Sequence, residues 1–474
     1  MELLVSLAAT PSVLSLAGDS AGAAASFASS LTLVYIALGA LRARPLLRFF
    51  LRAVALIAAL AAVAPLLFFL ISKRASSAAP DVFLALCAGV GAVFVDANAA
   101  RAMSCAAERA TVAHVGTFAL RATLLTLMND AHSIKGSAAR VFSDAAIGAS
   151  SARALAGAAV LTAAGATLLA RVRVKDARVR ALAVAVVIIA SLIPFHVSLR
   201  ACAMWVPGAI AARPVVVFLW CAACVALLPL PAARDAAGIV RARKVYHFAF
   251  ASMVVIPMSI SFRRGAAGVS SADVSFIAAA LAGALLGFVI LETARALDVL
   301  PPRISALVRE RLHRHADKRD NARGVLLPHI ALVAGTLFPL LVTEISGAGA
   351  AGAAPAVAKA LEFVHLTAAP IAVGVGDATA ALVGLWSARV GVARPWVGSS
   401  GKTVNGTVAF AASALAVHVA VLAFVGGGGA LTTKSFFVAG AAAVAGAVAE
   451  VLSGDVDNIV VPCAAWAAAL IASK

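Results

Sequence analysis

Charged residues are scarce in this chain. Asp, Glu, Lys and Arg together make up 13% of its 474 residues, whereas a soluble domain needs about a quarter of its residues charged to cover its surface. Hydrophobic residues make up 63%, and the mean hydropathy is +1.01. Water therefore cannot be the main solvent of this surface, which excludes an ordinary soluble enzyme.

Cysteine and acidic residues are also few. The six cysteines give no disulfide framework, and Cys221 and Cys224, although spaced as a redox or metal pair, lie inside an apolar run that predicts buried membrane thiols. The 39 Lys and Arg residues outnumber 21 Asp and Glu residues, giving a net charge of +18. Because these cations are spread over short loops rather than gathered in one arm or domain, we do not expect nucleic acid as a partner.

Long apolar runs dominate the sequence instead. A bilayer requires helices of about 20 apolar residues. The clearest runs are Ala53–Ser72, Asp81–Ala97, Leu155–Ala170, Ala181–Val197, Val215–Leu230, Phe276–Leu291, Val325–Val342, Thr407–Phe424 and Ile459–Ile471. With weaker runs included, the sequence predicts an all-α polytopic integral membrane protein with about 13 to 15 transmembrane helices.

The loops between these runs alternate in charge. The basic loops are Arg42–Arg52, Arg101–Arg109, Arg171–Arg180, Arg234–Lys244, Arg303–Arg323 and Arg389–Lys402. The loops between them, such as Gly347–Ala354 and Gly426–Gly429, carry little charge. By the positive-inside rule the basic set faces the cytosol. Lys73-Arg74 and Arg263-Arg264 are the exceptions, because they fall on the opposite side.

Four polar clusters stand out in the second half of the chain, where ionisable groups are costly and therefore informative. They are Arg243-Lys244-x-x-His247; Asp317-x-x-Asp320; Gly374-x-Gly376-Asp377 with Gly401-Lys402-Thr403-x-Asn405-Gly406-Thr407; and Glu450 with Asp457-Asn458. The loop charges place all four at or near the cytosolic ends of their helices. A shared site for a charged cytosolic substrate is the simplest explanation.

The third cluster is the most informative of the four. We expect one span to end at Gly376 and another helix to begin at Asp377. The start of a helix binds anions, and glycines let phosphate approach the chain, so this junction is a candidate phosphate site. The alternatives are a capping role for Asp377 and a topological role for Lys402. The loop before Thr403 lacks the first glycine of a P-loop and has no preceding strand, so a Walker-type ATP site is not expected.

These motifs resemble those of the CTP-dependent polyprenol kinases. The resemblance rests on Gly376-Asp377, Lys402-Thr403-x-x-Gly406-Thr407, Glu450 with Asp457-Asn458, and Arg243-Lys244-x-x-His247, which is similar to the family's RKxxH element. It covers roughly residues 240–474. We therefore expect an N-terminal multi-span membrane region at 1–230 and a kinase membrane region with a cytosol-facing active site at 231–474.

Two features resemble the dolichol kinase branch in particular. They are Asp317-x-Arg319-Asp320 followed by Leu326-Leu-Pro-His329, and a hydrophobic N-terminal region of about 230 residues. The resemblance implies transfer of the γ-phosphoryl group of CTP to dolichol in the endoplasmic reticulum membrane, giving dolichyl phosphate for protein glycosylation. One residue departs from the pattern, since Asn405 stands where the family has Glu. Asn would suffice there if that Glu only bonds the backbone, but not if it binds metal.

The resemblance also implies a role for each site residue. Asp377, His247 and Asp457 are the expected catalytic residues, and Asp377, Glu450 and Asp457 the expected ligands of a divalent metal, Mg²⁺ or Ca²⁺. The expected substrate and nucleotide contacts are Arg243, Lys244, Gly376, Lys402, Thr403, Gly406, Thr407 and Asn458. His247 and Asp377 are both candidates for taking the alcohol proton. We expect Asp377 to be needed for catalysis and dispensable for folding.

Other functions remain open at this point. A phytol or farnesol kinase, in a plastid membrane in the phytol case, and a CTP-dependent diacylglycerol kinase share the motifs. A phosphatidate cytidylyltransferase also uses CTP but releases pyrophosphate instead of CDP. A transporter would also have many spans, but the gathering of charges at one face and the lack of an evident inverted repeat argue against it.

Overall fold

The described part of the chain is helical throughout. The computed structural model describes residues 144–172, 174, 176–227, 236–264, 269–312, 327–346, 355–396, 401–426, 430–453 and 457–473, and these ranges contain no strand apart from an isolated bridge between Pro395 and Thr403. The predicted all-α class is confirmed. The apolar runs Ala53–Ser72 and Asp81–Ala97 lie outside the described residues.

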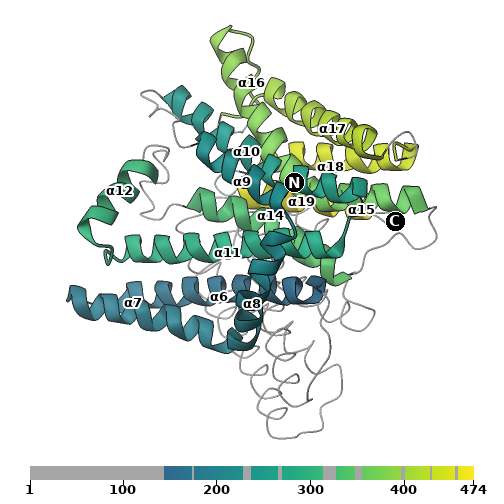
Figure 1. Ribbon diagram of the computed structural model, residues 1–474. Helices are drawn as coiled ribbons and strands as arrows, with labels where there is room; N and C mark the ends of the chain where they lie inside the picture. Colours follow the sequence, from purple (N-terminus) through teal and green to yellow (C-terminus); the bar gives the residue numbers. More distant parts are fainter. Residues whose placement is uncertain are drawn as a thin grey trace, which may run out of the picture. The chain divides into compact units, whose positions relative to one another are not determined.

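Figure 1 shows the described helices, labelled in chain order where there is room. They are α6 (Asp144–Val172), α7 (Ala177–Leu192), η2 (Ile193–Phe195), α8 (His196–Ala211), α9 (Pro214–Leu227), α10 (Ala236–Arg264), α11 (Ser271–Ala296), α12 (Pro302–Leu312), α14 (Leu327–Ser346), α15 (Pro355–Ile371), η4 (Ala372–Gly376), α16 (Asp377–Arg389), α17 (Val404–Gly426), α18 (Thr433–Leu452) and α19 (Asp457–Ser473).

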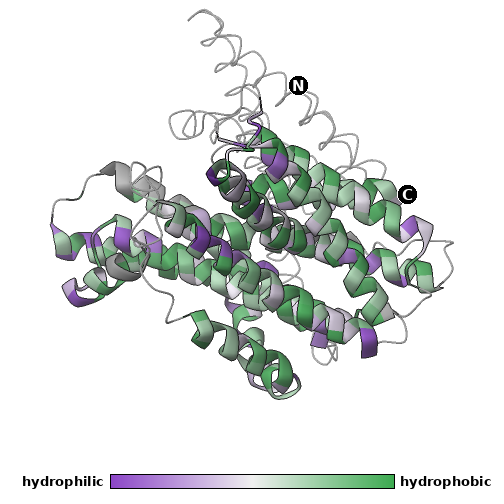
Figure 2. Ribbon diagram, turned by 90° about the horizontal axis from the view of Figure 1, so that it is seen from above, coloured by the Kyte–Doolittle hydropathy of each residue, from purple (hydrophilic) through white to green (hydrophobic). Residues whose placement is uncertain are grey.

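Seven helical segments among the described residues are long and apolar enough to cross a membrane. They are Asp144–Ala163, Ala177–Ala211, Ala237–Arg264, Ser271–Ala296, Ala356–Arg389, Val404–Val425 and Thr433–Leu452. Most of the residues along these helices are accordingly hydrophobic, as the colouring of the ribbon in Figure 2 shows. The chain is therefore a multi-pass membrane protein. The predicted total of 13 to 15 spans includes runs before residue 144, which lie outside the description.

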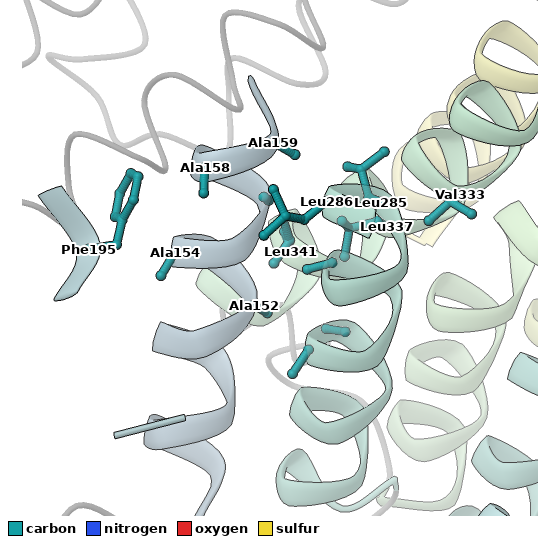
Figure 3. Close-up of a cluster of buried hydrophobic side chains, with 14 of the residues drawn as sticks. Ala152, Ala154, Ala158, Ala159, Phe195, Leu285, Leu286, Val333, Leu337 and Leu341 are labelled. Carbon is teal, nitrogen blue, oxygen red and sulfur yellow. The ribbon is translucent and has the colours of Figure 1, made fainter. Parts of the chain in front are cut away.

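A core of small and aliphatic side chains holds the first described helices together. α11 packs along α6, and α8 and α14 complete the cluster (Figure 3). α6 contributes almost only alanines to it, among them Ala152 and Ala158, both fully buried. A side chain at Gly148 would overlap Ser275 on α11. Because lipid tails are as apolar as the side chains, close approach of small residues is what makes such helices associate.

The chain divides into two compact units that do not follow the predicted boundary at residue 230. One unit contains Ala122–Val451 and Val461–Lys474, and the other contains Met1–Arg121 and Leu452–Val460. Helices α6 to α9 thus belong to the same unit as α10 to α17. The functional division at residue 230 stays a prediction. The predicted site residues from Arg243 to Glu450 lie in the unit that contains Ala122–Val451. Asp457 and Asn458 lie in the other unit.

Cys221 and Cys224 differ from their predicted environment. Both are free thiols on α9, and both are exposed on the surface of the described chain rather than buried. α9 is apolar along its whole length and has no buried residue. In a membrane protein such a surface is suited to contact with lipid, which explains apolar exposure without a protein partner.

Candidate functional site

Asp377 lies inside a continuous helical run. Its backbone N–H bonds to the carbonyl of Ala372, five residues earlier, and Gly376 has right-handed helical dihedrals. α15, η4 and α16 therefore join through one π turn into the span Ala356–Arg389. The predicted helix break at Gly376 is wrong, and Asp377 is not an N-cap. Single π turns occur often at functional sites.

The glycines before Asp377 serve helix packing rather than access for phosphate. A Cβ atom at Gly374 would overlap the side chain of Ala251 on α10, and one at Gly376 would lie 2.6 Å from the ring of Phe410 on α17. Gly446 on α18 meets the same ring, with a built Cβ 2.9 Å away. The absence of side chains thus lets α10, α17 and α18 close around the π turn. The structure therefore assigns Gly374 and Gly376 a packing role, whereas the sequence suggested that they let phosphate approach the chain.

The close approach of α10 places two of its side chains on Asp377. The Lys244 ammonium donates to Oδ2 of Asp377 at 2.5 Å, and Nδ1 of His247 lies 3.2 Å from the same oxygen. All three residues are buried, with 3% of Asp377 exposed. A carboxylate buried to this extent is stable only when it is paired and hydrogen-bonded, and here it has both kinds of partner.

The neighbours of His247 define the hydrogen-bonding role of its Nδ1 atom. Its Nδ1 atom lies 3.1 Å from the carbonyl oxygen of Val373 as well as 3.2 Å from Asp377 Oδ2. Both neighbours are hydrogen-bond acceptors, so Nδ1 must carry the proton. His247 therefore donates into the π turn and to Asp377, which fixes the carboxylate relative to the helix that bears it.

A second ion pair lies beside the first. Lys402, which precedes α17, donates to Oε1 of Glu450 in the last turn of α18 at 2.5 Å. Lys402 also interacts electrostatically with Asp377. The sequence predicted that six side chains converge on one pocket: Arg243, Lys244, Asp377, Lys402, Glu450 and Asp457. The structure brings four of them, Lys244, Asp377, Lys402 and Glu450, into one cluster. Three motifs separated by long stretches of chain thus contribute to it.

The residues after Lys402 shape the loop that carries it. Thr403 caps α17, because its hydroxyl accepts the backbone N–H of Gly406 at 3.1 Å. A side chain at Gly406 would meet the carbonyl of Ala380, with a built Cβ 2.8 Å away, so this glycine lets α16 and α17 pack closely. Thr407 accepts a hydrogen bond from the indole of Trp396 at 2.9 Å. These three predicted nucleotide contacts therefore have structural roles in the loop.

Asn405 replaces the acidic residue expected from the resemblance. Its side-chain oxygen accepts the backbone N–H of Arg394 at 3.4 Å, across the base of the loop. Lys402 and Val404 bond backbone groups of the same loop, through Trp396 and Arg394 respectively. A neutral amide is sufficient for a backbone contact of this kind. The observed role therefore agrees with the alternative in which this position only holds the loop.

Arg243 directly precedes Lys244 on α10 and is half-buried. Its predicted role as a contact to the nucleotide phosphates stays a prediction. The cations paired in the cluster are Lys244, with Asp377, and Lys402, with Glu450.

The described residues do not by themselves form a metal site. Among them no three His, Cys, Asp or Glu side chains are placed to hold an ion. Asp377 and Glu450 are each neutralised by a lysine instead. A resident metal bound by protein alone does not fit this arrangement, and the expected metal ligands stay a prediction.

Other predicted residues lie elsewhere in the chain. Asp457 begins α19, and its carboxylate accepts the backbone N–H of Asn458 at 2.9 Å. Both belong to the other unit. Asp317 to Asp320 lie outside the described residues. The sequence reasoning missed Phe410, whose ring fills the space left by Gly376 and Gly446; a search for aromatic residues facing glycines on neighbouring spans would have found it.

Comparison with family models, curated proteins and solved structures yields no match. The function of the chain is therefore inferred from the residues themselves and from their placement around Asp377.

Proposed function

We propose that this chain is a CTP-dependent lipid kinase that transfers the γ-phosphoryl group of CTP to the terminal hydroxyl of dolichol in the endoplasmic reticulum membrane. The observation that carries the proposal is the proximity of two ion pairs, Lys244 with Asp377 and Lys402 with Glu450. These residues come from separate motifs, each of which resembles a motif of the polyprenol kinases. Their meeting in one buried cluster supports a common task.

The cations of the cluster suit a triphosphate. Phosphoryl transfer is mostly positioning and neutralisation of charge on the phosphate oxygens. The side chain of Lys402 is 22% exposed, so its ammonium can exchange Glu450 for phosphate more easily than the more buried Lys244 can exchange Asp377. Arg243 adds a guanidinium, which binds phosphate with two parallel N–H donors. Mg²⁺ bound to the phosphates of CTP would enter as part of the substrate.

Asp377 is placed to receive the lipid hydroxyl. Lys244 and His247 both bind its Oδ2 atom, and in the described part of the chain Oδ1 has no hydrogen-bond partner. The alcohol donates its proton to Oδ1 while its oxygen bonds to the γ-phosphorus. The bond from that phosphorus to the β–γ bridging oxygen breaks, and CDP leaves. His247 acts as a positioning residue that holds the carboxylate.

The surroundings favour an acceptor that is itself a lipid. Asp377 lies within a membrane-spanning helical run, about 14 Å along the axis from Trp386. Trp386 and Trp396 are 60% and 40% exposed, as is typical of aromatic residues at a membrane interface. A hydroxyl attached to an isoprenoid tail can reach Asp377 from the bilayer, whereas a water-soluble alcohol would have to leave its solvent.

Purified protein in lipid nanodiscs tests this proposal. It is incubated with CTP labelled in the γ-phosphate and with dolichol, phytol, farnesol or diacylglycerol in parallel. We expect label in dolichol above the other alcohols, and we expect unlabelled CTP but not ATP to compete. Preferential competition by ATP, or transfer to none of the alcohols, would refute the assignment.

A further inference from the structure

A cavity of about 320 Å³ lies at the end of α10 that is remote from Lys244. It is lined by the turn between α8 and α9, the last turns of α10 and the first turns of α11. Its polar lining consists of Arg213, Ser261, Arg264 and Asp273. Its volume is within the range of small-molecule sites in proteins, which is about 300 to 1,000 Å³.

This cavity is separate from the cluster around Asp377. Ser261 follows Lys244 by 17 positions on the same helix, which corresponds to about 26 Å along its axis. That length is close to the thickness of a bilayer's hydrocarbon core, about 30 Å. The two sites therefore belong to opposite membrane faces, and a ligand of one does not reach the other.

Arg213 is held rigidly in the cavity wall. Its Nε atom donates to Oδ1 of Asp273 at 2.7 Å, Nη1 donates to the carbonyl of Ala209 at 3.2 Å, and its guanidinium lies 5.0 Å from the ring centroid of Phe276. The side chain is only 11% exposed. In the described ranges no protein group pairs with Nη2, which leaves that edge of the guanidinium for a ligand.

Two more donors face the same space. Arg264 lines the cavity and has no ion-pair or hydrogen-bond partner among the described residues. The Ser261 oxygen accepts the backbone N–H of Ser270 at 2.9 Å, so its own O–H is left to donate. Arg213 and Arg264 against Asp273 leave one net positive charge. The lining is thus suited to a compact anion with several oxygen acceptors.

Arg264 and its neighbour Arg263 are adjacent cations that fall on the side opposite to the basic loops. Among the described residues they are the pair that departs from the alternation of loop charges. Positive charge on the non-cytosolic side opposes the rule that orients membrane helices, so a separate reason for it is needed. Arg263 packs over the ring of Phe424, 5.8 Å from its centroid, and does not line the cavity. The two adjacent arginines therefore have different surroundings, which makes them a matched pair for testing.

We propose that this cavity binds a phosphate group at the membrane face opposite the cluster around Asp377, with Arg213, Arg264 and Ser261 as its donors. A phosphate offers the oxygen acceptors that guanidinium groups bind in pairs. It can belong to a phospholipid headgroup of that leaflet or be free phosphate in solution. The site does not depend on the proposed kinase function.

The test uses the full chain in nanodiscs of phosphatidylcholine with a minor fraction of phosphatidylglycerol. Retained lipid is measured by native mass spectrometry for the wild type, Arg264→Gln, Arg263→Gln and Asp273→Asn. In a second arm the thermal midpoint is measured in pure phosphatidylcholine with inorganic phosphate or chloride at equal ionic strength. The midpoint in chloride also reports whether each variant is folded.

We expect Arg264→Gln to weaken phosphate binding about tenfold, and Arg263→Gln to leave it unchanged. Asp273→Asn should strengthen binding, because it removes the carboxylate that competes for Arg213; a variant that merely damaged the fold would not do so. Selective retention of phosphatidylglycerol identifies a headgroup, and stabilisation by inorganic phosphate identifies a soluble ligand. Equal effects of the two arginine variants, or no gain with Asp273→Asn, would overturn the proposal.

Discussion

The ammonium of Lys244 lies 2.5 Å from Oδ2 of Asp377 and joins α10 to α16 across 133 positions of sequence. Both side chains are buried. The pair therefore has two functions, since it connects two membrane spans and holds the carboxylate on which the proposed chemistry depends. Variants at these positions affect stability as well as turnover, and the two effects must be separated.

Asp377→Asn is expected to abolish kinase activity and also to destabilise the protein. The change leaves Lys244 buried without its counter-charge, at a cost of about 3 kcal/mol. This revises the expectation from sequence that Asp377 is dispensable for folding. The double variant Lys244→Met/Asp377→Asn should recover most of the thermal stability and remain inactive. Turnover in the double variant would show that Asp377 is only structural.

His247→Asn and His247→Ala form a matched pair. Asn can place an amide N–H where Nδ1 of the histidine donates to Val373 and Asp377, whereas Ala cannot. If His247 positions Asp377, His247→Asn should retain about a tenth of the wild-type kcat and exceed His247→Ala by about tenfold. Single-turnover rates measure the difference. Equal loss in both variants would indicate that the other ring nitrogen acts as the base.

Lys402→Gln should raise the KM for CTP about tenfold, because one charge-assisted contact to phosphate is lost. The KM for the lipid alcohol should change little. Lys434→Gln is the control, since Lys434 is exposed at the other end of α18 from Glu450. An unchanged KM for CTP in Lys402→Gln would leave this lysine with only its topological role.

Gly376→Ala should destabilise the protein by about 1 to 3 kcal/mol, because the new methyl group would meet the ring of Phe410. Phe410→Leu in the same chain should restore part of the loss. Gly440→Ala on α18 has open space around it and should be neutral or slightly stabilising. Thermal midpoints in nanodiscs distinguish the three. A neutral Gly376→Ala would contradict the packing role assigned to this glycine.

The class of fold was predictable, whereas the path of the helices around Asp377 was not. Apolar runs of membrane length depend only on local composition, and loop charges suggested which polar residues share a face. Continuity through Gly376 depends on Ala251 and Phe410, residues of other helices that are distant in sequence. A glycine-rich stretch has the same local pattern whether it ends a helix or lets two helices touch.

The charges of the site were predictable, but their pairing was not. The polar clusters predicted one shared site, and the structure pairs Lys244 with Asp377 and Lys402 with Glu450. The sequence could not predict that each carboxylate meets a lysine, because this depends on the crossing of α10 with α16 and on the loop before α17. The cavity beside Arg213 could not be predicted either, because it depends on how the turn between α8 and α9, α10 and α11 pack together.

The fate of the phosphates of CTP distinguishes a kinase from a cytidylyltransferase. Wild-type protein in nanodiscs with dolichol is given CTP labelled at the α-phosphate in one reaction and at the γ-phosphate in another. A kinase should transfer the γ label to the lipid and release the α label in CDP. The folded double variant Lys244→Met/Asp377→Asn should leave both labels in CTP. Entry of the α label into lipid with release of pyrophosphate would contradict the proposed kinase function.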